Sequence, residues 1–347
     1  MNASELRIAA FGDLLMEQRP TDTELAQVAP LLQGYDLVTG NIDTVVSLAG
    51  AKMPKYANLH APRELAIDLN RLGIDVATLA NNHTMDFGAE ALLDGLAAFE
   101  EAGIATVGAG ANLAAASAPL YREVHGRTIA FIACSSTLSE LAAATDELPG
   151  VSPLKVSQSL LLDTDLILEQ PGSVPVVKTW IEDAELDRIS AVLAEARSRA
   201  DVVLVAYHAG VPTFWRSPSH PIVQEYETQA CRAFIDAGAD AVLGCHAHEV
   251  HGIEFYRGRP IFYCLANFWV GDFHRYPWME VDSFIAELTF AEGSAEPIVS
   301  IVTIRLDDTG VPRFDAEGRG ADLLAQRSDG LATEMIEPGR YRVSPAS

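Results

Sequence analysis

Two histidines, His246 and His248, lie two residues apart directly after the apolar run Ala241–Leu243. The run is typical of a short buried strand, and a helical pattern precedes it. A strand end holds a side chain rigidly, while the loop that follows leaves it open to solvent. Histidine is also the side chain best suited to bind a metal or to move protons near neutral pH. Two loop histidines that are close by chance are the alternative, and the rest of the chain decides between the two interpretations.

The same arrangement recurs elsewhere in the chain. A helical pattern, a glycine, a short apolar strand and then polar residues occur at Leu65–His83 and again at Phe234–His248. Alternating helices and strands predict an α/β fold, in which ligands gather beyond the carboxyl ends of the strands. Polar side chains of ligand type follow five predicted strands: Asp13, Asp43, Asn82 with His83, His208, and His246 with His248. We therefore predict one site at which these five strand ends meet.

These residues form a ligand set of carboxylate and amide oxygens with imidazole nitrogens. Such a set suits Zn, Mn or Fe(II), and it lacks the thiolates of a closed structural zinc site. Asp43 is suited to bridge two ions, as in two-metal hydrolysis. His83, with Asp86 three residues later, is suited to act as a general acid that a carboxylate orients.

The remaining pattern predicts the elements that hold this site. We expect one domain over residues 1–306, followed by a C-terminal tail, residues 307–347, for which no periodicity defines elements. Residues 138–178 are also left unassigned. Strands are predicted at 6–11, 36–40, 74–80, 104–107, 121–124, 128–133, 202–207, 241–243, 252–256, 260–265, 283–290 and 299–306, and helices at 23–33, 62–72, 89–102, 182–198 and 222–237, with loops at 211–221 and 267–280.

Composition limits the classes of function. The chain has 347 residues, 49% of them hydrophobic, so it can bury a substantial core, and its formal charge of −24 disfavours nucleic acid and anionic membranes as partners. The N-terminus has neither a basic region nor a long apolar region, and no stretch is apolar enough to span a bilayer. The four cysteines form no Cys-x-x-Cys pair, so we expect reduced thiols and a cytoplasmic protein.

The motifs resemble those of the CapA family of poly-γ-glutamate capsule proteins. The resemblance covers roughly residues 8–268 and rests on Gly12-Asp13, Asn41-Ile42-Asp43, Ala80–Gly88, His208-Ala209-Gly210, Gly244–His248 and Gly252–Phe268. It implies the calcineurin-like metallophosphatase fold, a β-sandwich flanked by helices. It also implies that Asp13, Asp43 and His248 hold one metal, that Asp43, Asn82, His208 and His246 hold a second, and that His83 is the catalytic histidine.

Several residues depart from the family pattern. The superfamily's Asp-x-His is Asp13-Leu14-Leu15 here, although the CapA family usually lacks this histidine too, and a usual glutamate is Asp43. Cys245 replaces a usual histidine, and Ala266 replaces the glycine of a Gly-Asn-Phe signature. These departures support a second hypothesis, because a CapA-like scaffold serves as a metal-independent peptide epimerase in lasso-peptide biosynthesis. Acid/base groups would then come from His83, His208, His246 and Asp13, and from Cys245 if neighbouring imidazoles lowered its pKa.

Large aromatics and two arginines lie in loops close to the predicted site. Trp215 and Trp269 are candidates for substrate contact, and Arg216 and Arg275 are candidates to bind a substrate carboxylate. We expect His60, His125, His220, His251 and His274 to lie outside the ligand set.

The sequence thus favours metal-assisted hydrolysis or transfer on a glutamyl polymer or peptide. Peptide epimerisation without a metal and a non-catalytic assembly role are the alternatives.

Overall fold

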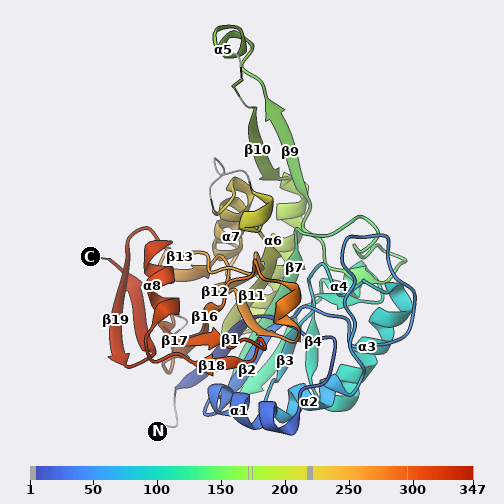
Figure 1. Cartoon of the computed structure of the whole chain (residues 1–347), viewed down its shortest axis with the longest axis vertical. Coiled ribbons are helices and arrows are strands. Elements are labelled where there is room, and N and C mark those ends of the chain that lie inside the picture. The colour runs from blue at the N-terminus through green and yellow to red at the C-terminus, as the bar shows by residue number, and fades with distance from the viewer. Residues whose placement is uncertain (1–4, 171, 174, 217–221, 295, 347) are drawn as a thin grey trace.

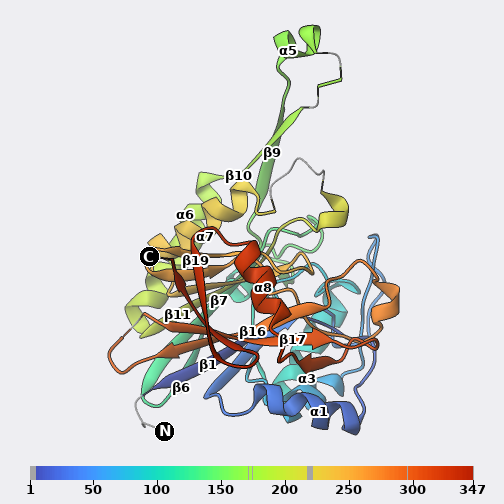
Figure 2. The same ribbon diagram turned by 60° about the vertical axis from the view of Figure 1, so that its left-hand side comes forward.

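Two β-sheets packed face to face form the body of the molecule in the computed structural model (Figures 1 and 2). The structure describes residues 5–346 except 171, 174, 217–221 and 295. The largest apolar cluster includes side chains of both sheets, such as Phe11 and Phe284 from one sheet and Leu204 and Phe262 from the other. The predicted α/β sandwich is therefore confirmed.

The larger sheet has ten strands, and the strands on one side of it are parallel. Strands β1 (Leu6–Leu15), β2 (Leu37–Ile42), β3 (Val76–Thr78) and β4 (Ala105–Val107) run in parallel, as expected for a sheet built from alternating strands and helices. Antiparallel strands extend the sheet beyond β1: β16 (Asp282–Phe290), β17 (Ile298–Leu306), β20 (Arg340–Pro345) and β19 (Leu331–Glu337), with β18 (Pro312–Phe314) also on β17.

The smaller sheet has six strands. Its centre holds the parallel strands β7 (Arg127–Ser135), β11 (Val202–Ala209), β12 (Ala241–His246) and β14 (Arg259–Phe262). The antiparallel strands β6 (Leu120–Val124) and β13 (Ile253–Tyr256) flank it. Because the parallel strands of each sheet end at one edge, the loops after β1, β2 and β3 can meet the loops after β11 and β12.

Helices cover the outer faces of the two sheets. The helices α1 (Asp22–Leu32), α2 (Leu65–Arg71) and α3 (Gly88–Ala102) join the core of the large sheet, and α6 (Asp183–Arg199) and α7 (Glu225–Asp236) pack on the small one. Short elements complete the body: α4 (Leu113–Ala116), β5 (Ala109–Gly110), β8 (Gly150–Val151) and the 3₁₀ turns Thr213–Trp215 and Phe273–Arg275. None of the helices among the described residues is long and apolar enough to cross a membrane.

Three segments differ from the sequence prediction. The predicted loop 267–280 begins with a strand, β15 (Asn267–Val270), which pairs with the end of β1 and lengthens β1 past Asp13 to Leu15. The unassigned stretch 138–178 contains β9 (Val156–Leu161), α5 (Thr164–Glu169) and the start of β10 (Val176–Ile181). Residues 307–347, where the pattern predicts no elements, form β18, α8 (Arg319–Gln326), β19 and β20, and β20 pairs with β17.

Gly12 allows β1 to pass close to the segment before β15. The backbone N–H of Asp13 donates to the carbonyl of Ala266 over 2.8 Å. A Cβ atom on Gly12 would lie 2.0 Å from that carbonyl oxygen. The glycine therefore fixes the position of Asp13, the first polar residue of the predicted site.

We predict that Gly12→Ala lowers the free energy of unfolding by at least about 2 kcal/mol, because the added methyl group has no space and the neighbour is backbone. Chemical denaturation measures this change. Gly95→Ala in α3 is the control, since its Cβ would meet its nearest neighbour at 3.4 Å, and its stability should be equal or slightly higher. Equal stability of the Gly12→Ala protein and the wild type would contradict this account.

Candidate metal centre

The structure brings all six predicted ligands together where the two sheets meet. Asp13 lies in β1, Asp43 follows β2, and Asn82 lies in the loop after β3. His208 lies at the end of β11 and His246 at the end of β12, with His248 two residues on. The carboxylate and imidazole atoms of Asp13, Asp43 and His248 all lie within 4.8 Å of one another.

Asp13 accepts hydrogen bonds from both sheets. One carboxylate oxygen accepts from Asn41 Nδ2 over 2.7 Å, and the other accepts from the backbone N–H of His246 over 3.0 Å. His248 Nδ1 lies 3.2 Å from the second oxygen. Burial by itself raises the pKa of Asp13, but the hydrogen bond and charge of His248 outweigh burial, with help from His208 and Asn41, so the pKa falls below its usual range. Asp13 is therefore held as a carboxylate.

Asp43 is also fully buried but differs sharply from Asp13. Neither of its carboxylate oxygens finds a hydrogen-bond partner among the described residues. His208 Nε2 lies 3.9 Å from one of these oxygens. A buried charge without partners is costly, and such groups usually pair with a cation or coordinate a metal. The unpartnered oxygens of Asp43, beside Asp13 and His248, thus fit a divalent cation.

The three imidazoles of the site lie in contact with one another or with shared partners. His208 Nε2 lies 2.8 Å from Asn82 Oδ1 and 3.1 Å from His246 Nδ1. Burial is the main cause that lowers the pKa of His208 and His246, so both rings are held neutral, as metal ligands require. His248 differs, because Asp13 raises its pKa against the effect of burial.

The backbone of the histidine segment is held in an uncommon conformation. The backbone angle φ is 110° at His246 and 55° at His248, and residues other than glycine rarely adopt such positive values. The backbone of His246 donates to Asp13, and the ring of His248 contacts Asn267 Oδ1 at 2.9 Å. Strain of this kind persists only where the surroundings fix it, and it is concentrated at functional sites.

His83 lines the mouth of the site and is oriented by Asp86. His83 Nδ1 lies 2.6 Å from one Asp86 oxygen, which also accepts from the backbone N–H of Leu59. The other Asp86 oxygen accepts from Lys55 Nζ over 2.5 Å. This pairing leaves Nε2 of His83 as the ring nitrogen that can act on a substrate.

Cys245 does not meet the condition for an acid/base role. The residue is buried in β12, and burial raises the pKa of its thiol well above the usual value, with Asp13 and Cys264 adding to the increase. The lowered pKa that this role requires is therefore absent, chiefly because the thiol is buried.

Two of the four residues predicted to contact substrate lie away from the cleft over the site. Trp269 belongs to β15 and is 1% exposed in the core, because the strand that holds it pairs with β1. Arg216 turns to Glu249 at 3.2 Å and to Thr213, and it does not line the cleft over the site. Trp215 and Arg275 do line that cleft, whose volume is about 150 Å³.

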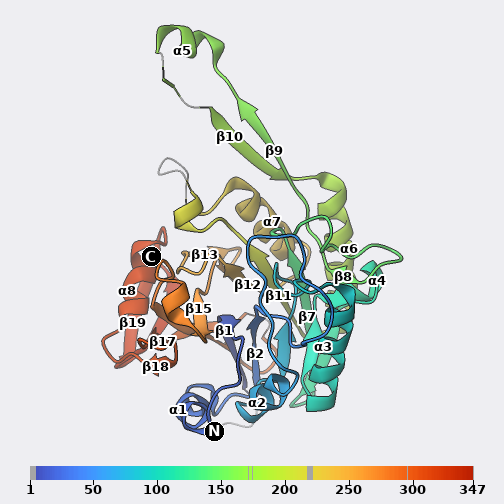
Figure 3. The same ribbon diagram turned by 45° about the vertical axis from the view of Figure 1, so that its right-hand side comes forward.

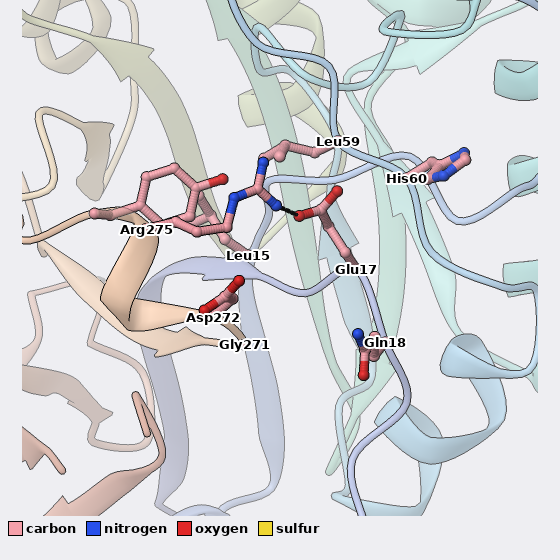
Figure 4. A pocket seen from close by; sticks show the side chains of 9 residues that line it. Leu15, Glu17, Gln18, Leu59, His60, Gly271, Asp272 and Arg275 are labelled. Carbon is pink, nitrogen blue, oxygen red and sulfur yellow. Dashed lines mark hydrogen bonds and ion pairs between the residues drawn. The ribbon is translucent and has the colours of Figure 1, made fainter. Parts of the chain in front are cut away.

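Aromatic side chains form one wall of this cleft. Trp215, Phe214 and Trp278 stand around the opening, and the ring of Trp278 lies 5.6 Å from that of His248. A second pocket of about 310 Å³ adjoins it and shares Arg275 (Figure 4). Figure 4 shows the guanidinium of Arg275 paired with the carboxylate of Glu17 across this pocket.

Five histidines were predicted to lie outside the ligand set. His60 stacks on Phe87, His125 binds Asp36, His251 contacts Glu249, and His274 lies in the 3₁₀ turn after β15. His220 lies outside the described residues.

Three positioning residues were missed by the sequence analysis. Asn41 holds Asp13, Asn267 holds His248, and Lys55 holds Asp86. Asn41 and Asn267 were visible as parts of Asn-Ile-Asp and Asn-Phe motifs, but nothing in the sequence distinguishes Lys55 from a surface lysine.

Comparisons with known proteins agree with the motifs. Residues 7–272 match the family model described as "Bacterial capsule synthesis protein PGA_cap". The chain is 27% identical over 267 residues to "PGA biosynthesis protein CapA" of Bacillus subtilis and 29% identical over 276 residues to "Capsule biosynthesis protein CapA" of Bacillus anthracis. These alignments cover 76% of this chain, and 61% and 59% of the relatives.

Two further comparisons complete the picture. The chain is 32% identical over 235 residues to a "Probable polyglutamine synthesis accessory protein" of Mycobacterium tuberculosis, covering 66% of this chain and 54% of the relative. Among solved structures, a hypothetical protein from Thermus thermophilus is 16% identical with a TM-score of 0.47, covering 86% of this chain and 98% of that one. The chain thus spans between about half and two thirds of the length of the curated relatives named here.

The contrast between the two buried carboxylates gives a paired prediction for metal-free protein. Asp43→Asn should raise the free energy of unfolding by about 1–2 kcal/mol, because it removes a buried charge that has no hydrogen-bond partner. Asp13→Asn should lower it by about 1–3 kcal/mol, because it disrupts three contacts. Denaturant unfolding in the presence of a chelator measures both, and destabilisation of similar size in both variants would contradict the analysis.

Proposed function

Because the chain belongs to the bacterial capsule synthesis PGA_cap family, we propose that it is an enzyme that hydrolyses or transfers a glutamyl polymer or peptide with the help of a divalent metal. The single observation that carries this proposal is the buried carboxylate of Asp43, which finds no partner among the described residues and lies beside Asp13 and His248. A chance grouping of polar residues does not explain why six ligand-type side chains come together from the ends of five strands.

In this proposal the residues have distinct roles. Asp13, Asp43 and His248 would hold one ion, and Asp43, Asn82, His208 and His246 a second. Mn, Fe or Zn all suit this ligand set. When bound, such an ion would polarise the scissile carbonyl and generate a hydroxide nucleophile near neutral pH.

The groups at the mouth of the cleft would act on the substrate directly. His83 Nε2 would deliver a proton to the leaving group, while Asp86 and Lys55 hold the ring in place. Arg275 would bind a substrate carboxylate in place of Glu17. Trp215 and Trp278 would cover the bound chain and limit the access of water.

We predict that His83→Asn lowers kcat by about 100-fold or more while the protein retains its metal, since general acid catalysis contributes about 10²–10⁴. The assay is release of free glutamyl ends from poly-γ-glutamate or glutamyl peptides, with Mn, Fe or Zn added to chelator-treated protein. His125→Asn is the control, because His125 contacts Asp36 at an exposed turn and should leave kcat unchanged. Undiminished turnover in the His83→Asn protein would contradict the assigned role.

Metal-independent peptide epimerisation is the second candidate. The observation in its favour is that His83, His246 and His248 all line one cleft, so that two acid/base groups can face the same substrate carbon. Product formed in deuterated water would then carry deuterium at Cα, and activity would survive chelation. Unlabelled, hydrolysed product would exclude this candidate. Retained metal with no activity on any of these substrates would favour the third hypothesis, a non-catalytic assembly protein.

A further inference from the structure

The second pocket beside the metal centre is lined by charges of both signs, and we call it the charged pocket. Arg275 contributes a guanidinium, and Glu17 and Asp272 contribute carboxylates (Figure 4). Its volume of about 310 Å³ lies at the lower end of the range for small-ligand sites, about 300–1,000 Å³. A single amino-acid residue with its charged groups is therefore a ligand of suitable size.

The two carboxylates of the charged pocket follow neighbouring strands. Glu17 lies just beyond the end of β1, and Asp272 lies just beyond the end of β15. These strands pair in parallel and lie side by side in Figure 3, so they end at the same edge. The charged pocket is thus built onto the strand that carries Asp13.

The charged pocket adjoins the cleft over the metal centre. The two cavities share four lining side chains, those of Leu15, Leu59, Arg275 and Tyr276. The cleft is also lined by His246 and His248, two of the candidate ligands. A ligand held in the charged pocket can therefore extend a reactive group toward the candidate metal centre.

The ion pair of Arg275 and Glu17 is the internal counterpart of a ligand that carries both charges. The side chain of Arg275 is 53% exposed and that of Glu17 30%, and exposed pairs of this kind contribute little to stability. A ligand with a carboxylate and an ammonium can take the place of this pair and leave neither residue without a partner. The side chain of Asp272 accepts no hydrogen bond from the described residues, so it is a second acceptor for the ammonium.

A ligand that carries carboxylates alone suits the charged pocket less well. One carboxylate can bind Arg275, but Glu17 then loses its partner and, with Asp272, repels the other carboxylates of a glutamyl chain. The net charge of −24 adds to this repulsion. The interior of a glutamyl polymer is therefore disfavoured, and an end that carries an ammonium is favoured.

The linkage of the chain decides which end offers both charges together. In a γ-linked glutamyl chain, the first residue has a free α-ammonium and a free α-carboxylate on the same carbon. Its side-chain methylenes separate these charges from the scissile γ-carbonyl. In an α-linked chain the ammonium is next to the scissile carbonyl, and the carboxylate lies at the end of the side chain.

We propose that the charged pocket binds the amino-terminal residue of a γ-linked glutamyl chain, with its α-carboxylate at Arg275 and its α-ammonium at Glu17 and Asp272. The assignment rests on the proposed function for its reaction. Water adds its hydroxyl to the γ-carbonyl carbon in the cleft, the bond from that carbon to nitrogen breaks, and the leaving nitrogen takes a proton from His83. The chain is thereby shortened from its amino end, one glutamate at a time.

The first test measures binding without turnover, by calorimetry on the metal-loaded His83→Asn protein. It compares γ-linked triglutamate, its N-acetyl derivative and α-linked triglutamate, each as the L and the D enantiomer. We expect the γ-linked peptide with a free amine to bind at least about tenfold more tightly than either of the others. The α-linked peptide is the matched control, since it has the same composition and charge. Equal affinities, or no binding of the γ-linked peptide up to about 10 mM, would overturn the proposal.

Glu17→Gln and Asp272→Asn, introduced into the same protein, test the contacts of the ammonium. Each should weaken binding of the γ-linked peptide at least about fivefold and leave binding of the N-acetyl derivative undiminished, because that derivative has no ammonium. Glu292→Gln is the matched control and should change neither affinity, since Glu292 is exposed in the turn after β16, at the end of that strand that pairs with the start of β1. Equal losses for both peptides would overturn the assigned contacts.

A third measurement separates this assignment from the proposed function. The wild type should release glutamate from poly-γ-glutamate from the start, while the mean chain length falls slowly, and acetylation of the amino ends should stop the release. Rapid shortening of the chains with little free glutamate would leave the proposed hydrolysis standing and overturn this assignment. The expected selectivity in calorimetry, without any hydrolysis by the wild type, would support this assignment and contradict the proposed function.

Discussion

One buried carboxylate, that of Asp13, connects the two sheets of this protein. It belongs to β1 of the large sheet, yet it accepts a hydrogen bond from the backbone of His246 in the small sheet and contacts the ring of His248. Gly12 lets β1 come close enough to the Ala266 carbonyl to hold this position. The alignment of the two sheets at their common edge, and with it the position of every candidate ligand, depends on these contacts.

The second carboxylate, that of Asp43, indicates that the common edge of the two sheets is a binding site and not only a packing contact. Its oxygens have no hydrogen-bond partner among the described residues, although it is fully buried. Burial also lowers the pKa of His208 and His246 and so favours the neutral imidazoles that metal ligation requires. A bound cation would account for both observations, since it would balance the charge of Asp43 and be coordinated by the imidazole nitrogens.

Much of this arrangement could be predicted from the sequence, because strand ends in an α/β fold meet at one edge whatever the details of packing. That rule alone placed Asp13, Asp43, His208 and His246 together. It could not place Trp269, because the pairing of β15 with β1 joins segments that are about 250 residues apart and leaves no local signal.

The hairpin of β9 and β10 was missed for a similar reason. Its connection is long and has no tight-turn motif, and apolar residues such as Leu160 and Val176 face solvent, so the usual alternation of buried and exposed positions is absent. The raised pKa of the Cys245 thiol comes mainly from burial, to which nearby carboxylates such as Asp13 add, and both arise only in the folded chain.

The most direct test of the account is the metal content of wild-type and Asp43→Asn protein, purified without chelator or affinity nickel and measured by elemental analysis. The account predicts about one to two equivalents of Mn, Fe or Zn in the wild type, lost in the variant. Less than about a tenth of an equivalent in folded wild-type protein, after incubation with each metal, would contradict the central claim and favour acid/base chemistry on a peptide.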